Sequence, residues 1–454
     1  MNASNDLTTG PVSGHFRRLA VPTAIGMIFT TLYNVVDVYF AGMLSTDAQA
    51  GLAISFQVFF VLIALGFGLS SAMSALVGNA LGERSGAAKA ISEQGISYGI
   101  IASIVLIILG QIASPFLIAV VSEPGSYRDA ANAYLGILIF AAPSFLLAFG
   151  LNGILMAQGD TVSMQRAQIA AFFANLVLNP VMIFGIPGLV QGIGFNGIAL
   201  STLVSQTGVM AYILWKVYRS EVMEGPSTGF APRLADFGVI TGQALPASFA
   251  MIVMMIAGFV VQYFLKGFGG AAVAAYGVAL RIEQLLLLPA FGLTGALLPI
   301  AAQNYGARNF DRVREAVRFC FKSGVMLMFG ASLVLWLAGK FAMGVFTDDP
   351  EVIRIGASYL AVDGFILPVY VMLFAINSLL QALKKPVWTL WIGVYRQGFG
   401  VLFFSYIFVR LFDLGVWGVW FGIAVAVTTG FVLSLWVAER VSGRLMGGLF
   451  RRPQ

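Results

Sequence analysis

Charge is scarce in this sequence. Of its 454 residues, 26 are Lys or Arg and 20 are Asp or Glu, so charged residues make up 10% of the chain, whereas a soluble domain carries about 25%. Apolar residues reach 59%, and a chain of this composition cannot cover its surface with polar side chains in water. The composition therefore excludes a soluble enzyme.

Cysteine and histidine are nearly absent as well. The chain has one of each, Cys320 and His15, which excludes a disulfide scaffold and a metal cluster built on Cys and His. We expect no bound cofactor. The net charge of +6 reflects where a membrane protein keeps its basic residues, so we expect no nucleic-acid partner.

Twelve long apolar stretches are present. A helix that crosses the hydrocarbon core needs about 20 apolar residues, and each stretch between charged or turn-rich breaks meets that length. The sequence therefore predicts an all-α integral membrane protein with twelve transmembrane helices. The stretches lie near 16–43, 50–78, 94–122, 131–156, 165–187, 191–217, 238–265, 271–303, 318–345, 352–382, 386–410 and 415–440.

Basic residues are distributed unevenly between the two sides of these spans. If the N-terminus is cytoplasmic, 19 Lys and Arg fall on the inner side, Arg451 and Arg452 among them, and five fall on the outer side. Basic residues accumulate in the cytoplasmic loops of membrane proteins. We therefore expect a multi-pass protein of the cytoplasmic (inner) membrane, embedded in the lipid bilayer with both termini in the cytoplasm.

The two halves of the chain repeat each other at a nearly constant shift. Six spans in each half give both halves the same orientation, which predicts two six-helix bundles related by a pseudo-two-fold axis along the membrane normal. We expect an N-terminal lobe at 1–217, a cytoplasmic linker at 218–237 and a C-terminal lobe at 238–454. The repeated pairs include Pro22 and Pro246 at a shift of 224, and Tyr134 with Tyr359 and Asn152 with Asn377 at a shift of 225.

An ionisable residue inside a span is costly and points to function. Asp37 lies in the outer half of the first span, and Tyr33 and Asn34, one helical turn earlier, share its face. The repeat partner of Asp37 is Val261, so the shared fold does not require the charge. We interpret Asp37 as a functional residue.

The fifth span offers partners for this carboxylate. Asn175 and Asn179 are one turn apart and lie on one helix face, and Pro180 frees a backbone carbonyl of the preceding turn. Such oxygens suit a Na⁺ ion or a proton site, although amides in spans also serve simply to join helices. The candidate cation-coupling residues are Asp37, Asn175, Asn179 and Thr202, with Ser201 as a further candidate and Asp37, Asn175 and Asn179 as the Na⁺ ligands.

Other polar residues inside spans are secondary candidates. Glu283 lies two residues from Arg281, on roughly the opposite face, and a structural and a functional role stay open. Asn152 is retained in the repeat. Asp363 is expected near the outer surface with a structural role, and Arg396 lies within the eleventh span.

Four motifs resemble the multidrug and toxic compound extrusion (MATE) family of transporters. They are Asn-Val-Val-Asp-Val-Tyr-Phe-Ala-Gly at 34–42, the glycine-rich segment at 66–82, Leu-Met-Ala-Gln-Gly-Asp-Thr at 155–161 and Gln-Asn-Tyr-Gly-Ala-Arg at 303–308. The resemblance implies a monomeric antiporter that exports varied cationic or amphiphilic organic compounds in exchange for H⁺ or Na⁺, by alternating access between two lobes.

The resemblance also assigns roles to residues. It implies that Asp37 is a cation-coupling residue, assisted in some members by an Asn and an Asp one turn apart in the fifth span. Here both positions are Asn, so the identity of the ion and its stoichiometry stay open. Other members have a Glu in the seventh span where this chain has Met254, so we expect coupling to rest in the N-terminal lobe.

Two other functions remain as alternatives. A lipid-linked oligosaccharide flippase of the same superfamily needs several cavity cations for a pyrophosphate, and only Arg281 and Arg396 fall within spans. A membrane-embedded enzyme needs a catalytic constellation that these residues do not supply. The Gly-Ile-Ser-Tyr-Gly segment at 95–99 matches a hydrolase elbow in letters, but it opens a span rather than a strand–turn–helix. We therefore expect no enzymatic activity.

Overall fold

The computed structural model of the chain describes residues 6–450. Arg451 and Arg452, which we count among the inner basic residues, lie outside this range. Within it, twelve helical segments are long and apolar enough to cross a membrane. The predicted all-α fold with twelve spans is confirmed.

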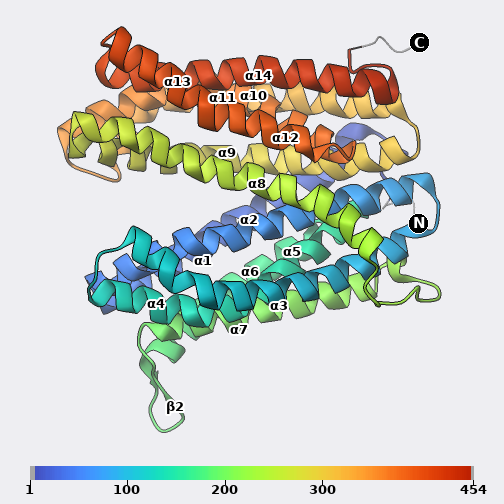
Figure 1. Ribbon diagram of the computed structural model, residues 1–454, viewed down its shortest axis with the longest axis horizontal. Coiled ribbons are helices and arrows are strands. Elements are labelled where there is room, and N and C mark those ends of the chain that lie inside the picture. The colour runs from blue at the N-terminus through green and yellow to red at the C-terminus, as the bar shows by residue number, and fades with distance from the viewer. Residues whose placement is uncertain (1–5, 451–454) are drawn as a thin grey trace. The chain divides into compact units, whose positions relative to one another are not determined.

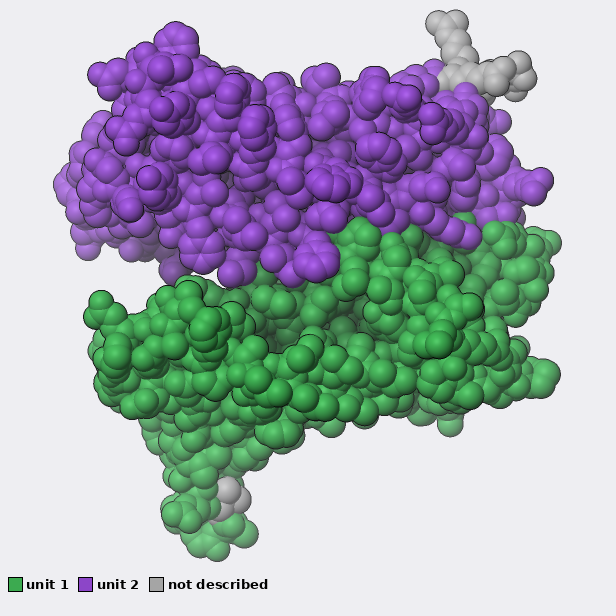
Figure 2. All heavy atoms as spheres, in the orientation of Figure 1, with its two compact units in different colours: residues 1–6, 25–248 green, residues 7–24, 249–454 purple. Residues whose placement is uncertain are grey.

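The chain divides into two compact units. Unit 1 comprises residues 1–6 and 25–248, and unit 2 comprises residues 7–24 and 249–454, coloured separately in Figure 2. These limits differ from the expected lobes, because the linker and the start of the seventh span belong to unit 1, and the first half of the first span belongs to unit 2.

The units therefore divide inside two helices, α1 (Val12–Leu44) and α8 (Leu234–Leu265). The division follows residue 24 in α1 and residue 248 in α8, two positions after Pro22 and Pro246. Proline removes a backbone hydrogen bond and kinks a helix, so each linking helix has a bending point near the place where it passes from one unit to the other.

Unit 1 is built mainly from the six α-helices α2 to α7 and a small hairpin, which can be followed in Figure 1. Strands β1 (Gly185–Ile186) and β2 (Val190–Gln191) pair antiparallel between the last two of these helices, and Figure 1 shows this hairpin projecting beyond the helices of the unit. The helical elements are α2 (Thr46–Glu83), α3 (Ala87–Val121), α4 (Ser126–Leu138), η1 (Ile139–Ala141), α5 (Ala142–Ala157), α6 (Val162–Phe184), α7 (Asn196–Tyr218) and η2 (Glu221–Met223).

The described part of unit 2 is built from helices, and one of its spans is irregular. The eleventh span runs through α12, η4, α13 and η5, of which η4 and η5 are π-helical. The π-helix is rare in proteins overall, and where it occurs it is often found at functional sites. The elements are η3 (Lys266–Phe268), α9 (Gly270–Gly306), α10 (Phe310–Gly344), α11 (Pro350–Ala382), α12 (Pro386–Gly393), η4 (Val394–Gly400), α13 (Val401–Tyr406), η5 (Ile407–Leu411) and α14 (Gly415–Met446).

Close helix packing explains part of the high glycine content. A Cβ atom built on Gly153 in α5 would lie 2.2 Å from the backbone oxygen of Ser70 in α2, so only glycine allows these two helices to approach so closely. In lipid, where apolar side chains gain nothing by leaving the solvent, such close contacts drive helix association.

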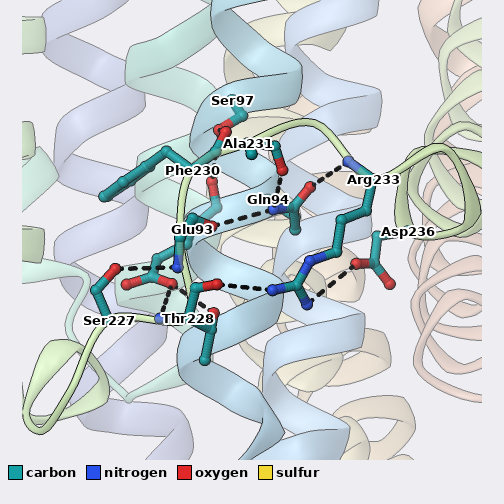
Figure 3. Close-up of polar contacts among 10 residues, drawn as sticks. Glu93, Gln94, Ser97, Ser227, Thr228, Phe230, Ala231, Arg233 and Asp236 are labelled. Carbon is teal, nitrogen blue, oxygen red and sulfur yellow. Dashed lines mark hydrogen bonds and ion pairs between the residues drawn. The ribbon is translucent and has the colours of Figure 1, made fainter.

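The segment that leads into α8 is fastened to α3 by three polar side chains (Figure 3). Glu93 accepts hydrogen bonds from the backbone N and Oγ1 of Thr228, at 2.9 and 2.6 Å. Gln94 accepts a hydrogen bond from the backbone N of Arg233 at 3.0 Å and donates one to the carbonyl of Ala231 at 2.9 Å. Ser97 donates to the carbonyl of Phe230. The segment that we expected to be a linker is therefore an ordered part of unit 1.

Candidate coupling site

Asp37 is the centre of a buried polar cluster in unit 1. Its side chain is 6% exposed, and its Oδ1 accepts hydrogen bonds from the Nδ2 atoms of Asn175 at 3.0 Å and Asn179 at 2.8 Å. Thr202 Oγ1 donates to the other carboxylate oxygen at 3.4 Å. Helices α1, α6 and α7 thus bring together the four residues that we selected from the sequence as coupling residues.

The local geometry of α6 explains the paired amides. Residues four apart lie on one face of a helix, so both asparagines point toward α1, and Asn179 also donates to Asn175 Oδ1 at 3.2 Å. Both are fully buried. Helix α6 continues through Pro180 to Phe184, so the amide pair is held within a continuous helix.

Two tyrosines extend the cluster. Tyr33 is hydrogen-bonded to Ser205 Oγ at 2.7 Å, and Ser201 Oγ accepts from Asn175 at 3.5 Å. Tyr134 in α4 lies within interaction range of Asp37 and Tyr33. Sequence reasoning did not select Tyr134 or Ser205 as site residues. The retention of Tyr134 in the repeat, opposite Tyr359, was the available signal for the first.

Asn34 and Asn152 lie outside this cluster. Asn34 is exposed and donates to the carbonyl of Thr30 at 3.0 Å. Around the axis of α1, Asn34 is rotated by about 60° to one side of Asp37 and Tyr33 by about 40° to the other side. Of the two, Tyr33 is buried against the neighbouring helices and Asn34 is exposed. Asn152 in α5 donates to Met156 Sδ at 3.5 Å.

The amide groups present nitrogen, not oxygen, to the carboxylate. Three neutral donors compensate the charge of a buried Asp37 without a basic partner, whereas direct Na⁺ coordination takes oxygen ligands. The Na⁺ ligand set that we expected therefore requires both amides to turn. Binding of a cation or a proton at Asp37 rearranges these hydrogen bonds, since a protonated carboxyl itself donates.

Unit 2 contains a second group of buried ionisable residues. Glu283 in α9 accepts a hydrogen bond from the hydroxyl of Tyr359 in α11. It is close enough to Asp363 and Arg396 to interact with both electrostatically. Arg396 lies in the π-helical η4, with its guanidinium 5.7 Å from the ring centre of Tyr370.

Asp363 lies in the interior of unit 2. It is fully buried, and neither carboxylate oxygen has a hydrogen-bond partner among the residues that the structure describes. Burial within the unit does not test the depth of a residue along its span, so the expectation that Asp363 lies near the outer surface of the membrane stays a prediction. Unit 2 therefore also contains a buried carboxylate pair, which the focus on the N-terminal lobe did not anticipate.

Aromatic rings line this second group. Tyr276, Tyr359 and Trp420 pack against one another with ring centres 5.0 to 6.1 Å apart. Arg281 is exposed, on the opposite face of α9 from Glu283, as expected. Across the residues that the structure describes, no group of three or more His, Cys, Asp or Glu side chains is placed to hold a metal ion.

Comparison with known proteins agrees with this architecture. A family model described as MatE matches residues 22–181 and 246–407; the two blocks begin at the repeated prolines. The multidrug export protein MepA of Staphylococcus aureus is 22% identical over 438 residues, 96% of this chain and 95% of that protein. MepA of Staphylococcus saprophyticus is 23% identical over 426 residues, 93% and 90% of the two chains.

A solved structure is similar over nearly the whole length. The outward-facing conformation of a multidrug resistance MATE family transporter of the MOP superfamily superposes with a TM-score of 0.89 at 25% identity, covering 98% of this chain and 99% of that one. Since the family model matches more than half of the sequence, in two blocks that follow the repeat, the chain belongs to the MATE family of membrane transporters.

Proposed function

We propose that this chain is a secondary antiporter that exports small cationic or amphiphilic organic compounds in exchange for an inward-moving cation. The observation that carries the proposal is Asp37, a carboxylate buried within a span and held by three neutral hydrogen-bond donors. Such a group is costly in a membrane and is characteristic of ion pathways. The description of MepA as a multidrug export protein supports the substrate class.

The coupling ion is H⁺ in this proposal. The amides of Asn175 and Asn179 turn their donor groups toward Asp37, an arrangement suited to a carboxylate that exchanges a proton. Na⁺ needs their oxygens instead. The absence of a second carboxylate among these hydrogen-bond partners fits a single exchanged charge at this site.

Helix α1 converts occupancy of Asp37 into movement. It carries Asp37 in its unit 1 part, while residues 7–24 belong to unit 2, and Pro22 provides a bending point near the division. Rearranged hydrogen bonds at Asp37 change the contacts of α1 with α6 and α7, and thereby the angle at which it leaves unit 1. Helix α1 would then take two conformations, with different angles at Pro22. Alternating access follows if these two conformations open the transport path to opposite sides of the membrane.

We also propose that both termini are on the cytoplasmic side of an inner membrane and that the protein acts as a monomer. In this proposal the chain transports its substrates and catalyses no covalent chemistry. A flippase for lipid-linked sugars is disfavoured because Arg281 is exposed, which leaves Arg396 as the buried cation of the two that lie in spans.

Efflux of a fluorescent organic cation from reconstituted vesicles tests the proposal. A proton gradient and a sodium gradient are imposed separately, on the native protein and on Asp37→Asn. We expect the proton gradient to drive efflux in the native protein and neither gradient to do so in Asp37→Asn. Asn34→Ala is the matched control, because Asn34 lies on the same helix but outside the cluster.

Each outcome has a defined meaning. Efflux driven by sodium alone refutes proton coupling but keeps the antiporter. Undiminished coupled efflux in Asp37→Asn removes Asp37 from the mechanism. If neither gradient moves the substrate in the native protein, the antiporter proposal fails.

A further inference from the structure

A basic, tryptophan-lined groove lies on unit 2, and none of the buried carboxylates is among the residues that line it. It is formed between the start of α12 and the last turns of α14, and it has a volume of about 240 Å³. The residues that line it are Lys385, Trp388, Trp436, Val437, Arg440, Val441, Arg444 and Leu445.

The rim of the groove carries uncompensated positive charge. Lys385, Arg440 and Arg444 are exposed, and none of them forms an ion pair with a residue that the structure describes. Glu439, the acidic neighbour of Arg440 in the chain, instead accepts a hydrogen bond from the backbone N of Leu449 at 2.8 Å. Three cations therefore face the groove opening without a carboxylate to balance them.

The groove is apolar below this rim. Val437 is buried, and Val441 and Leu445 continue its wall at four-residue intervals along α14. Trp388 is 42% exposed and Trp436 is 55% exposed, and the guanidinium of Arg440 lies 5.2 Å from the ring centre of Trp436. Tryptophan is enriched at the level of the lipid headgroups, so this end of α14 carries the features of the membrane interface.

The repeat provides an internal comparison. After a short deletion the repeat shift becomes 221, which relates Gly194 to Gly415. At this shift Trp215 and Arg219 correspond to Trp436 and Arg440, and they form the same stack in unit 1 at 5.1 Å. The position 225 before Lys385 is Asp160, whose carboxylate accepts hydrogen bonds from Ser163. Unit 1 thus keeps the tryptophan–arginine stack and has an acidic residue where unit 2 has a basic one.

We propose that the groove between α12 and α14 binds an anionic phospholipid. Lys385, Arg440 and Arg444 contact the headgroup phosphate, Trp388 and Trp436 lie beside the glycerol backbone, and Val437, Val441 and Leu445 contact the first part of an acyl chain. Basic pockets between membrane helices on the cytoplasmic side bind such headgroups. The site is specific to unit 2, and it is independent of the cation exchanged at Asp37.

The test measures phospholipid binding to the full-length protein. Native mass spectrometry of detergent-solubilised protein, titrated with phosphatidylglycerol or with phosphatidylcholine, gives the affinity for each. Each basic residue near an anionic lipid surface contributes about a fivefold gain in affinity. We therefore expect Lys385→Gln and Arg444→Gln each to weaken phosphatidylglycerol binding by about fivefold, and to leave phosphatidylcholine binding unchanged.

Two controls distinguish charge recognition from other effects. Lys385→Arg keeps the charge and is expected to keep the affinity, so a loss there overturns the assigned role of the charge. Arg219→Gln alters the corresponding stack in unit 1 and is expected to change nothing. Equal binding of the two lipids, full binding by both glutamine variants, or displacement of the lipid by an equal concentration of inorganic phosphate each overturns the proposal.

Discussion

Replacing Asn179 tests whether Asp37 is ionised in the candidate coupling site. Asn179 donates to Asp37 Oδ1 at 2.8 Å across the contact between α6 and α1. A hydrogen bond between neutral groups on membrane helices is worth about 0.6 kcal/mol on average, whereas one to a charged group is worth about 1.5–3 kcal/mol. The energy of this one bond therefore indicates whether Asp37 is ionised.

A double-mutant cycle isolates that energy. The variants are Asp37→Leu, Asn179→Leu and the combination, and the unfolding free energy of each is measured by reversible denaturation in mixed micelles. We expect a coupling energy of about 1.5–3 kcal/mol under conditions in which the carboxylate is ionised. Lowering the pH until it is protonated is expected to reduce the coupling toward about 0.6 kcal/mol.

The control cycle pairs Asp37 with Asn34, which is one turn away but bonded to its own helix. We expect a coupling energy near zero there. A coupling energy between Asp37 and Asn179 that does not exceed that of the control, at any pH at which the protein is folded, refutes the cluster as we describe it. A value that does not change with pH refutes the exchange of a proton at Asp37.

Three further predictions concern other parts of the molecule. Glu93→Ala removes the acceptor of two hydrogen bonds from the segment before α8. Hydrogen exchange of the backbone amides in that segment, measured by mass spectrometry, is therefore expected to accelerate by about tenfold or more. Unchanged exchange contradicts the stabilisation of this segment by Glu93. Gly153→Val forces a side chain against the backbone oxygen of Ser70 and is expected to cost about 1–3 kcal/mol of unfolding free energy or more, while Gly136→Ala, with open space around it, changes little. Asp363→Asn removes a buried carboxylate that has no hydrogen-bond partner among the described residues and is expected to raise the thermal unfolding midpoint; a fall in the midpoint contradicts a destabilising effect of this carboxylate.

The sequence was sufficient to predict that Asp37, Asn175 and Asn179 lie together, because two strong constraints apply there. Helical spacing places Asn175 and Asn179 on one face, and the cost of a carboxylate in lipid makes Asp37 stand out. The same rules did not predict that Asp363 is buried, because the position of a residue along a span does not say which side of the helix faces a neighbouring helix. Tyr134 is also defined by its neighbours in space: it approaches Asp37 only through the packing of α4 in unit 1.

The unit boundaries show a further limit of sequence reasoning. A polar, proline-containing connection predicts a linker at 218–237, but Glu93 and Gln94 accept hydrogen bonds from the backbone of that segment, which belongs to unit 1. The division occurs instead within α1 and α8, in apolar helix with no change of composition. In the sequence, these positions are indicated only by Pro22 and Pro246. A proline within a span does not show whether the helix is merely kinked there or passes from one structural unit to the other.

The two halves share a scaffold and differ in charge, and that difference locates the proposed chemistry. Tyr134 and Tyr359 recur in both units, yet one lies near Asp37 and the other bonds to Glu283. The position that corresponds to Asp37 in the second half is Val261, so an ion that binds at Asp37, as we propose, would act on α1 without a matching event in α8. A repeat with identical chemistry in both halves responds symmetrically to an ion, whereas one charged site on one linking helix gives the ion a directed effect. Moving the carboxylate to α8, as Val261→Asp with Asp37→Val, is therefore expected to abolish gradient-driven efflux even if the protein folds, and retained efflux would show that the asymmetry is dispensable.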